Sequence, residues 1–163
     1  MLYHPSKFKG ISDGIKAFEV AKKKYPDIML VMFGIVRGRD VPQYVEFHER
    51  PTQHKLREIY SSCDIFLSPS HLEGFNLCPV EAMACKCATI LTDVGAVHDY
   101  AVHGTTSLIC APGDVNCISS YLIRLLRNEE ELKRLSMTGF NFIKNLTVEN
   151  AVRELESTFM SFI

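Results

Sequence analysis

Short apolar runs alternate with amphipathic stretches along almost the whole chain. The run at 28–35, IMLVMFGI, is almost wholly apolar, which is typical of a strand buried on both faces of a parallel sheet. The stretch at 12–25 instead gathers its apolar residues on one helical face and stops before Pro26. Strands that alternate with helices in this way predict a parallel sheet covered by helices on both faces.

The remaining segments continue this alternation. Further strands are expected at 1–4, 44–48, 64–68, 88–92 and 107–110, and further helices at 52–62, 77–86, 96–101, 115–127, 129–143 and 148–162. The sequence contains no internal repeat and no Gly/Ser-rich linker. We therefore expect a single three-layer α/β/α domain over residues 1–163, a length that suits one hydrophobic core.

The overall charge argues against a nucleic-acid partner. The chain carries 18 basic and 19 acidic side chains, a formal net charge of -1, so any anion must be bound by a local site. No apolar run approaches the roughly 18 residues needed to cross a bilayer, and the first ten residues lack the apolar core of a secretory signal. These features predict a cytoplasmic protein with at most peripheral membrane contact.

The six cysteines could suggest a metal site or disulfides. Each lies beside apolar residues and no C-x-x-C pair occurs, so small buried thiols kept reduced are the simpler interpretation. Cys85 and Cys87 form the only close pair, and a single C-x-C spacing is weak evidence for zinc. No Asp-x-Asp pair is present to hold a cation, so we expect neither a metal site nor a cofactor.

The segment most informative about function is 67–86, LSPSHLEGFNLCPVEAMACK, which runs from a strand end through a polar loop into a helix. Ligands of open parallel sheets bind beyond the carboxyl ends of the strands. Gly74 allows a close backbone approach, and Asn76 is a good N-cap for a helix beginning at Leu77. The free amides of Leu77 and Cys78, with the helix dipole, then form an anion site suited to phosphate.

Two glutamates eight positions apart, Glu73 and Glu81, flank this helix start. A carboxylate on a packed helix is unfavourable unless it is hydrogen-bonded, and a pair of ribose hydroxyls is a suitable partner for Glu81. Two structural alternatives stay open. Glu81 could merely complement the helix dipole, and Glu73 could be a solvated loop acid.

The pattern S-P-S-x-x-E-G-F-x-L followed by E-A-M-A-C resembles the signature of the retaining, group 1 glycosyltransferases with the GT-B fold. The resemblance continues through residues 89–114 and back to Lys9-Gly10 and Phe33-Gly34, so it covers nearly the whole chain. It implies that the chain is the carboxy-terminal, donor-binding one of the family's two Rossmann-like domains. The amino-terminal acceptor domain is then absent from residues 1–163.

The resemblance also implies a role for each matching residue. Lys9 and Glu73 take the catalytic positions, with Lys9 on the diphosphate and Glu73 directed at the donor sugar, while Glu81 holds the ribose hydroxyls. The remaining positions are backbone contacts to the sugar, at Gly74, Phe75 and Asn76, and phosphate-binding amides, at Leu77 and Cys78. Without the resemblance, the sequence would favour an ordinary solvent-facing lysine at position 9.

Three departures from the family pattern matter. His4 stands where the family usually has an arginine, so the diphosphate clamp is expected to be weaker because histidine is largely neutral at pH 7. Asn76 replaces a usual glycine, which is easily tolerated. Lys86 replaces another glycine after the helix, where a left-handed residue costs roughly 1 kcal/mol, so we expect that turn to adjust locally.

The sequence thus predicts transfer from a nucleoside-diphosphate sugar to a glycan, lipid or small-molecule acceptor, without a metal and with retention at the anomeric carbon. The isolated domain is expected to be inactive. A stand-alone nucleotide- or sugar-binding module and a nucleotide-sugar epimerase are the alternatives.

Two further features of the sequence lie outside this motif. Arg37 and Arg39 either supplement the phosphate site or belong to an ordinary loop. The last helix is expected to expose part of its apolar face.

Overall fold

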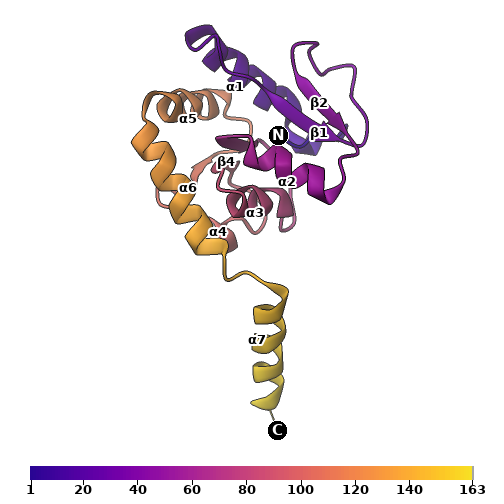
Figure 1. The fold of residues 1–163 in the computed structure, drawn as a ribbon, viewed down its shortest axis with the longest axis vertical. Coiled ribbons are helices and arrows are strands. Elements are labelled where there is room, and N and C mark those ends of the chain that lie inside the picture. The colour runs from indigo at the N-terminus through magenta and orange to yellow at the C-terminus, as the bar shows by residue number, and fades with distance from the viewer. Residues whose placement is uncertain (163) are drawn as a thin grey trace.

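The computed structural model describes residues 1–162; residue 163, the last of the predicted domain, lies outside the described residues. The chain folds into three layers, with parallel strands between two layers of helices (Figure 1). The strands are β1 (Val31–Gly34), β2 (Glu46–Glu49), β3 (Ile65–Ser68), β4 (Ala88–Thr92) and β5 (Leu108–Cys110). The helices are η1 (Lys7–Lys9), α1 (Ile11–Lys24), α2 (Gln53–Ser61), α3 (Leu77–Ala84), α4 (Val97–Tyr100), α5 (Val115–Arg127), α6 (Glu129–Ile143) and α7 (Val148–Met160). The predicted α/β class is confirmed.

The expectation of one continuous sheet and of a strand at 1–4 is wrong. The strands form two parallel sheets, β1–β2 and β3–β4–β5. The segment 1–4 contributes only an isolated parallel bridge from Leu2 to Phe33, and its backbone bonds go to the β1 side, including Tyr3 N to Phe33 O at 2.7 Å. Since this short segment forms no described ladder with β3, the sheet is interrupted there.

A groove of about 640 Å³ marks the interruption between the two sheets. Its walls come from the amino ends of β1 and β3, with Leu30 and Val31 on one side and Asp64 and Ile65 on the other. Ligands of open α/β sheets bind at the opposite, carboxyl ends of the strands. The candidate site is therefore expected beyond the carboxyl end of β3.

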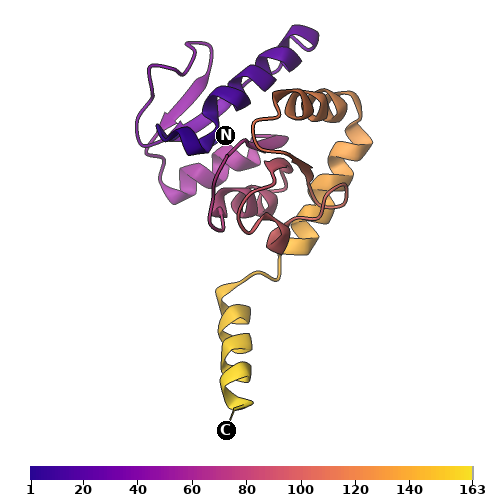
Figure 2. The same cartoon turned by 180° about the vertical axis from the view of Figure 1, so that it is seen from behind.

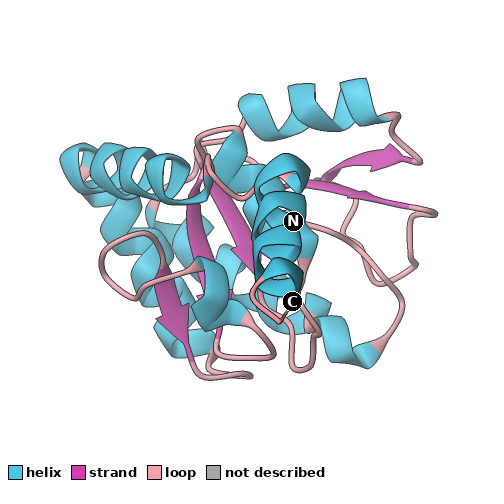
Figure 3. Cartoon of the chain, turned by 90° about the horizontal axis from the view of Figure 1, so that it is seen from below, coloured by secondary structure: helices cyan, strands magenta, loops and turns pink. Residues whose placement is uncertain are grey.

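Helices cover both faces of the strands, as Figure 3 shows for the β3–β4–β5 sheet. Helices α1 and α5 pack together over one face, where the core includes Ile90, Leu108 and Ile118. Helices α2 and α3 pack over the other face around Phe66 and Ala82. All five residues of β4 are buried, which explains the apolar run that predicted this central strand.

Helix α6 packs against α3 and β4, and its buried residues include Leu135 and Ile143. Helix α7 instead projects from the body of the molecule (Figures 1 and 2), and no residue of it is buried. The exposed apolar side chains of α7 include Val152, Leu155 and Phe159. The prediction that the last helix exposes an apolar face is thus confirmed. Within residues 1–162, no helix is long and apolar enough to cross a membrane.

Candidate functional site

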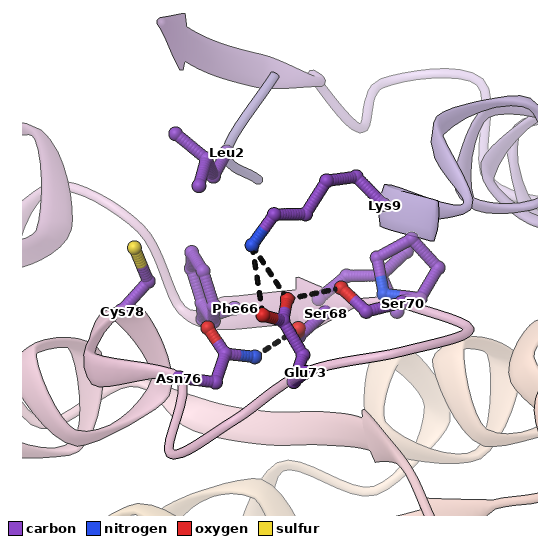
Figure 4. A pocket seen from close by; sticks show the side chains of 10 residues that line it. Leu2, Lys9, Phe66, Ser68, Ser70, Glu73, Asn76 and Cys78 are labelled. Carbon is purple, nitrogen blue, oxygen red and sulfur yellow. Dashed lines mark hydrogen bonds and ion pairs between the residues drawn. The ribbon is translucent and has the colours of Figure 1, made fainter. Parts of the chain in front are cut away.

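The loop that follows β3 places Glu73 against Lys9 (Figure 4). Lys9 Nζ lies 2.7 Å from Glu73 Oε1 and 2.9 Å from Oε2, and Ser70 Oγ donates to Oε1 at 2.7 Å. The side chains of Lys9 and Glu73 are 24% and 10% exposed. The two residues that the family resemblance placed at the catalytic positions, 64 residues apart in sequence, are therefore in direct contact.

Lys9 reaches the loop because the chain makes a close turn at Gly10. Gly10 has a φ of 60°, and a Cβ there would lie 1.9 Å from the carbonyl oxygen of Pro69, so a larger residue would push the two segments apart. The carbonyl of Phe8 then accepts from His71 N at 2.6 Å and Leu72 N at 3.3 Å. These backbone contacts fix the lysine segment to the loop that carries Glu73.

The other side of the same loop rests on Gly95, which the sequence did not single out. Its φ is 56°, and a Cβ would lie 2.2 Å from Gly74 O and 2.5 Å from Glu73 O. Ala96 N donates to Gly74 O at 2.9 Å. The available signal was a glycine three residues after the predicted strand 88–92, in the loop where neighbouring segments of a parallel sheet meet.

The predicted N-cap at Asn76 needs a correction. Asn76 precedes helix α3, but it has a φ of 63° and makes no side-chain cap bond. Its Nδ2 instead donates to Ser68 Oγ at 2.9 Å, at the end of β3. The uncapped start leaves the first amides of α3, including those of Leu77 and Cys78, without intrahelical partners, as an anion site requires.

The turn after α3 is also not adjusted in the way the sequence predicted. Lys86 keeps the left-handed conformation that a glycine would favour, with a φ of 64°. Lys86 N donates to Met83 O at 3.0 Å and Cys87 N to Ala82 O at 2.9 Å, the bond pair of a Schellman motif. Because this motif requires a left-handed residue, lysine adopts it despite the cost.

A small cavity of about 10 Å³ joins these elements, enough for about one water molecule. The predicted site residues on its wall are Lys9, Glu73, Asn76 and Cys78. The other predicted contacts lie outside the cavity wall. A Cβ at Gly74 would meet no atom within 4 Å, and Leu77 is 64% exposed. Phe75 is 42% exposed, with its ring 5.3 Å from that of Tyr100. The cavity is therefore the floor of an open surface site.

Glu81 does not line this cavity and meets a residue that the sequence analysis missed. The hydroxyl of Tyr60 donates to Glu81 Oε2 at 3.0 Å. Burial, with the neighbouring Cys78 and Glu81, raises the pKa of Tyr60 well above its ordinary value, so the hydroxyl stays a donor. Burial also raises the pKa of the Cys78 thiol. A tyrosine near the end of a predicted helix carried no signal for this contact, because the partner is 21 residues away.

Other candidates lie apart from the cavity. His4 is exposed and its Nδ1 accepts from Ser6 N at 3.1 Å. Arg37 donates from its guanidinium to Val45 O at 3.2 Å and Pro42 O at 2.5 Å, so it holds its own loop together. Arg39 is exposed. Of the two interpretations of Arg37, the structure therefore favours the ordinary loop.

Taken together, the site offers a cation and free helix amides to an anion, and two carboxylates to hydroxyl groups. All six cysteines are free thiols. Across residues 1–162, no three His, Cys, Asp or Glu side chains gather in a group that could hold a metal ion. The described groups thus combine hydrogen-bond acceptors with groups that can bind an anion.

The sequence of the chain matches a known protein family. Residues 5–142 match the family described as glycosyl transferases group 1. The capsular polysaccharide biosynthesis glycosyltransferase CapM of Staphylococcus aureus is 25% identical over 167 residues, covering 96% of this chain and 44% of CapM. The chain thus spans less than half the length of this relative.

Solved structures show the same architecture. The carboxy-terminal domain of the glycosyl transferase group 1 protein LpcC from Francisella tularensis has a TM-score of 0.79 and 26% identity, covering 88% of this chain and 83% of that one. HepE from Anabaena, solved in complex with UDP-glucose, has a TM-score of 0.83 at 16% identity, covering 98% and 47%, and supports the fold alone. The match along residues 5–142 and the shared architecture show that the chain belongs to the group 1 glycosyl transferases.

Proposed function

We propose that this chain binds the donor of a glycosyl transfer, a nucleoside-diphosphate sugar, at the surface formed by the loop after β3 and the start of α3. The observation that carries the proposal is the Lys9–Glu73 contact next to the uncapped helix start. It combines a cation and free amides for the diphosphate with a carboxylate for sugar hydroxyls. HepE, which has the same fold, was solved with UDP-glucose.

In this proposal each group has one task. Lys9 and the amides of Leu77 and Cys78 stabilise the diphosphate, both in the bound donor and as the leaving group gains charge. Glu73 accepts hydrogen bonds from the sugar, and the free oxygen of Glu81 accepts from the ribose. The exposed Phe75 and Gly74 then border the sugar position.

The finer features of the reaction are part of the same proposal. We propose that a complete enzyme built on this domain transfers the sugar with retention, without a metal ion, to an acceptor that the remaining length of such an enzyme would bind. Retention rests on the Glu73 and Glu81 motif and its family resemblance. A cytoplasmic location is proposed as well, because it would give the site access to nucleotide sugars.

A metal-free ligand screen tests the donor site. UDP, GDP and ADP are added to the chain in EDTA and the melting temperature is measured. Free ligand at 100 times its dissociation constant stabilises the folded state by about 2.7 kcal/mol, a shift of about 5 to 10 °C for a chain of this size. Absence of any shift at millimolar ligand would count against the site. A shift that appears only with magnesium would overturn the metal-free part.

A further inference from the structure

Tyr60 lies outside the family motif, yet it bonds directly to Glu81 of the proposed donor site. Its hydroxyl donates to Glu81 Oε2 at 3.0 Å. Tyr60 is only 3% exposed, so it does not itself offer a surface to a ligand. Its influence on the site must pass through the carboxylate that it contacts.

The position of that hydroxyl is fixed by packing on several sides. The Tyr60 ring meets Phe33 edge to face at 5.5 Å and Phe66 at 5.6 Å, a geometry that adds to the stability of aromatic clusters. The backbone carbonyl of Tyr60 accepts from the Cys87 thiol at 3.1 Å. The hydroxyl is thus held by the core of the α2–α3 face rather than by a mobile surface segment.

Glu81 is less constrained than Glu73. Glu73 is held by the Lys9 ammonium and the Ser70 hydroxyl, whereas Tyr60 is the only side chain of the described residues that donates to Glu81. A glutamate has three rotatable side-chain bonds, so a carboxylate without such a hydrogen bond can occupy several rotamers. The phenol fixes Oε2 and leaves Oε1 free.

We propose that Tyr60 is a positioning residue for donor binding: it orients the Glu81 carboxylate so that Oε1 can accept from the ribose hydroxyls of the nucleotide. This inference rests on the proposed donor site and adds a residue to it. The effect of Tyr60 is entropic, because an acceptor that is already oriented loses less rotational freedom when the ligand arrives.

The variant Tyr60→Phe removes the hydroxyl and keeps the ring. Isothermal titration in EDTA with UDP, GDP and ADP, and with their 2′,3′-dideoxy forms, compares it with the parent chain. Loss of one hydrogen bond to a carboxylate should weaken ribonucleotide binding about three- to tenfold. Binding of the dideoxy forms should change less than about twofold, since they lack the hydroxyls that Glu81 contacts.

A matched control removes a similar bond elsewhere. The Tyr3 hydroxyl donates to Asp40 Oδ1 at 2.7 Å, and its ring packs edge to face on Phe47. Tyr3→Phe should bind every ligand as the parent does. In a Glu81→Gln background, Tyr60→Phe should change ribonucleotide affinity less than about twofold, because the carboxylate that Tyr60 orients is gone.

Several results would overturn the inference. They are unchanged ribonucleotide affinity in Tyr60→Phe, an equal loss for both ligand types, or an undiminished loss in the Glu81→Gln background. If the parent binds no nucleotide, the proposed function itself fails, which is a distinct outcome. If Tyr60→Phe does not fold, NMR of the parent chain replaces it. The ¹³Cζ resonance of Tyr60 should shift when the ribonucleotide is added, but not when its dideoxy form is added. An unchanged resonance with both ligands would contradict the positioning role.

Discussion

Helix α3 starts after Asn76 and ends before Lys86, and both flanking residues have a left-handed backbone, with φ of 63° and 64°. At the amino end, the Asn76 amide bonds to Ser68 and the proposed donor site lies alongside. At the carboxyl end, Lys86 closes a Schellman motif and its ammonium lies 5.2 Å from the Phe140 ring centroid.

The difference between these two ends separates ligand binding from stability. The strained residue at the amino end has a side-chain bond that partly offsets its backbone cost, and its neighbours face a surface site. At the carboxyl end, the Lys86 carbonyl accepts from Ser136 Oγ at 2.6 Å. Within the part of the chain that the structure describes, however, the Lys86 side chain makes no hydrogen bond and does not line the small cavity. We therefore expect changes at the amino end to alter ligand affinity and changes at the carboxyl end to alter the free energy of unfolding.

The largest expected effect is on ligand affinity at the amino end. Lys9→Gln removes the cation that the proposal places on the diphosphate, and charge-assisted bonds are worth roughly 1.5–3 kcal/mol. The dissociation constant for UDP, measured by calorimetry, should rise about 10- to 100-fold. Lys7→Gln is the matched control, since Lys7 lies two residues earlier and is exposed. Equal losses in both variants would point to a general charge effect instead.

A smaller effect of opposite sign is expected at Glu73. Both oxygens of Glu73 engage Lys9 Nζ, so a diphosphate has to compete with this carboxylate for the same ammonium. A partly exposed ion pair is worth up to about 1 kcal/mol. Glu73→Gln should therefore strengthen UDP binding about two- to fivefold.

A nucleotide sugar should respond differently, because its sugar needs the carboxylate that the variant lacks. The gain in affinity should be smaller for UDP-glucose than for UDP. Glu58→Gln is the control for loss of one acidic charge, since Glu58 pairs with Lys55 on the surface at 2.9 Å. An unchanged or weaker affinity of Glu73→Gln for UDP would show that the Lys9–Glu73 pair does not compete with the diphosphate.

Local patterns predicted most of the elements. Helices 115–127 and 129–143 and strand 88–92 have the predicted bounds, because their apolar periodicity and buried runs are properties of the segments themselves. The segment 1–4 failed because strand formation there depends on neighbours on both sides. The 3-10 turn Lys7–Lys9 was missed because it is short.

The site was predictable in its residue types but not in all its contacts. The motif identified Glu73 and Glu81 as site residues. The structure adds a hydrogen-bond partner for each, Ser70 for Glu73 and Tyr60 for Glu81. The side chain of Asn76 bonds to Ser68 instead of capping the helix amides. This is a tertiary contact, which the N-cap preference of asparagine cannot predict. Local signals therefore identified the acceptors, while the groups that orient them required the fold.

The last and smallest effect tests the carboxyl end of α3. Glycine adopts the left-handed conformation without the Cβ conflict, so Lys86→Gly should raise the free energy of unfolding by about 0.5–1 kcal/mol, after allowing for glycine's greater freedom in the unfolded chain.

Asn76→Gly should change the free energy of unfolding by less than about 0.5 kcal/mol, because relief of the backbone is offset by loss of the Ser68 bond. Urea unfolding measures these changes. Lys144→Gly is the control: Lys144 is the C-cap of α6 and has a right-handed φ of -58°, so glycine there should destabilise. Destabilisation by Lys86→Gly, equal to that in Lys144→Gly, would mean that contact with Phe140 outweighs the strain, and the contrast between the two ends of α3 would not hold.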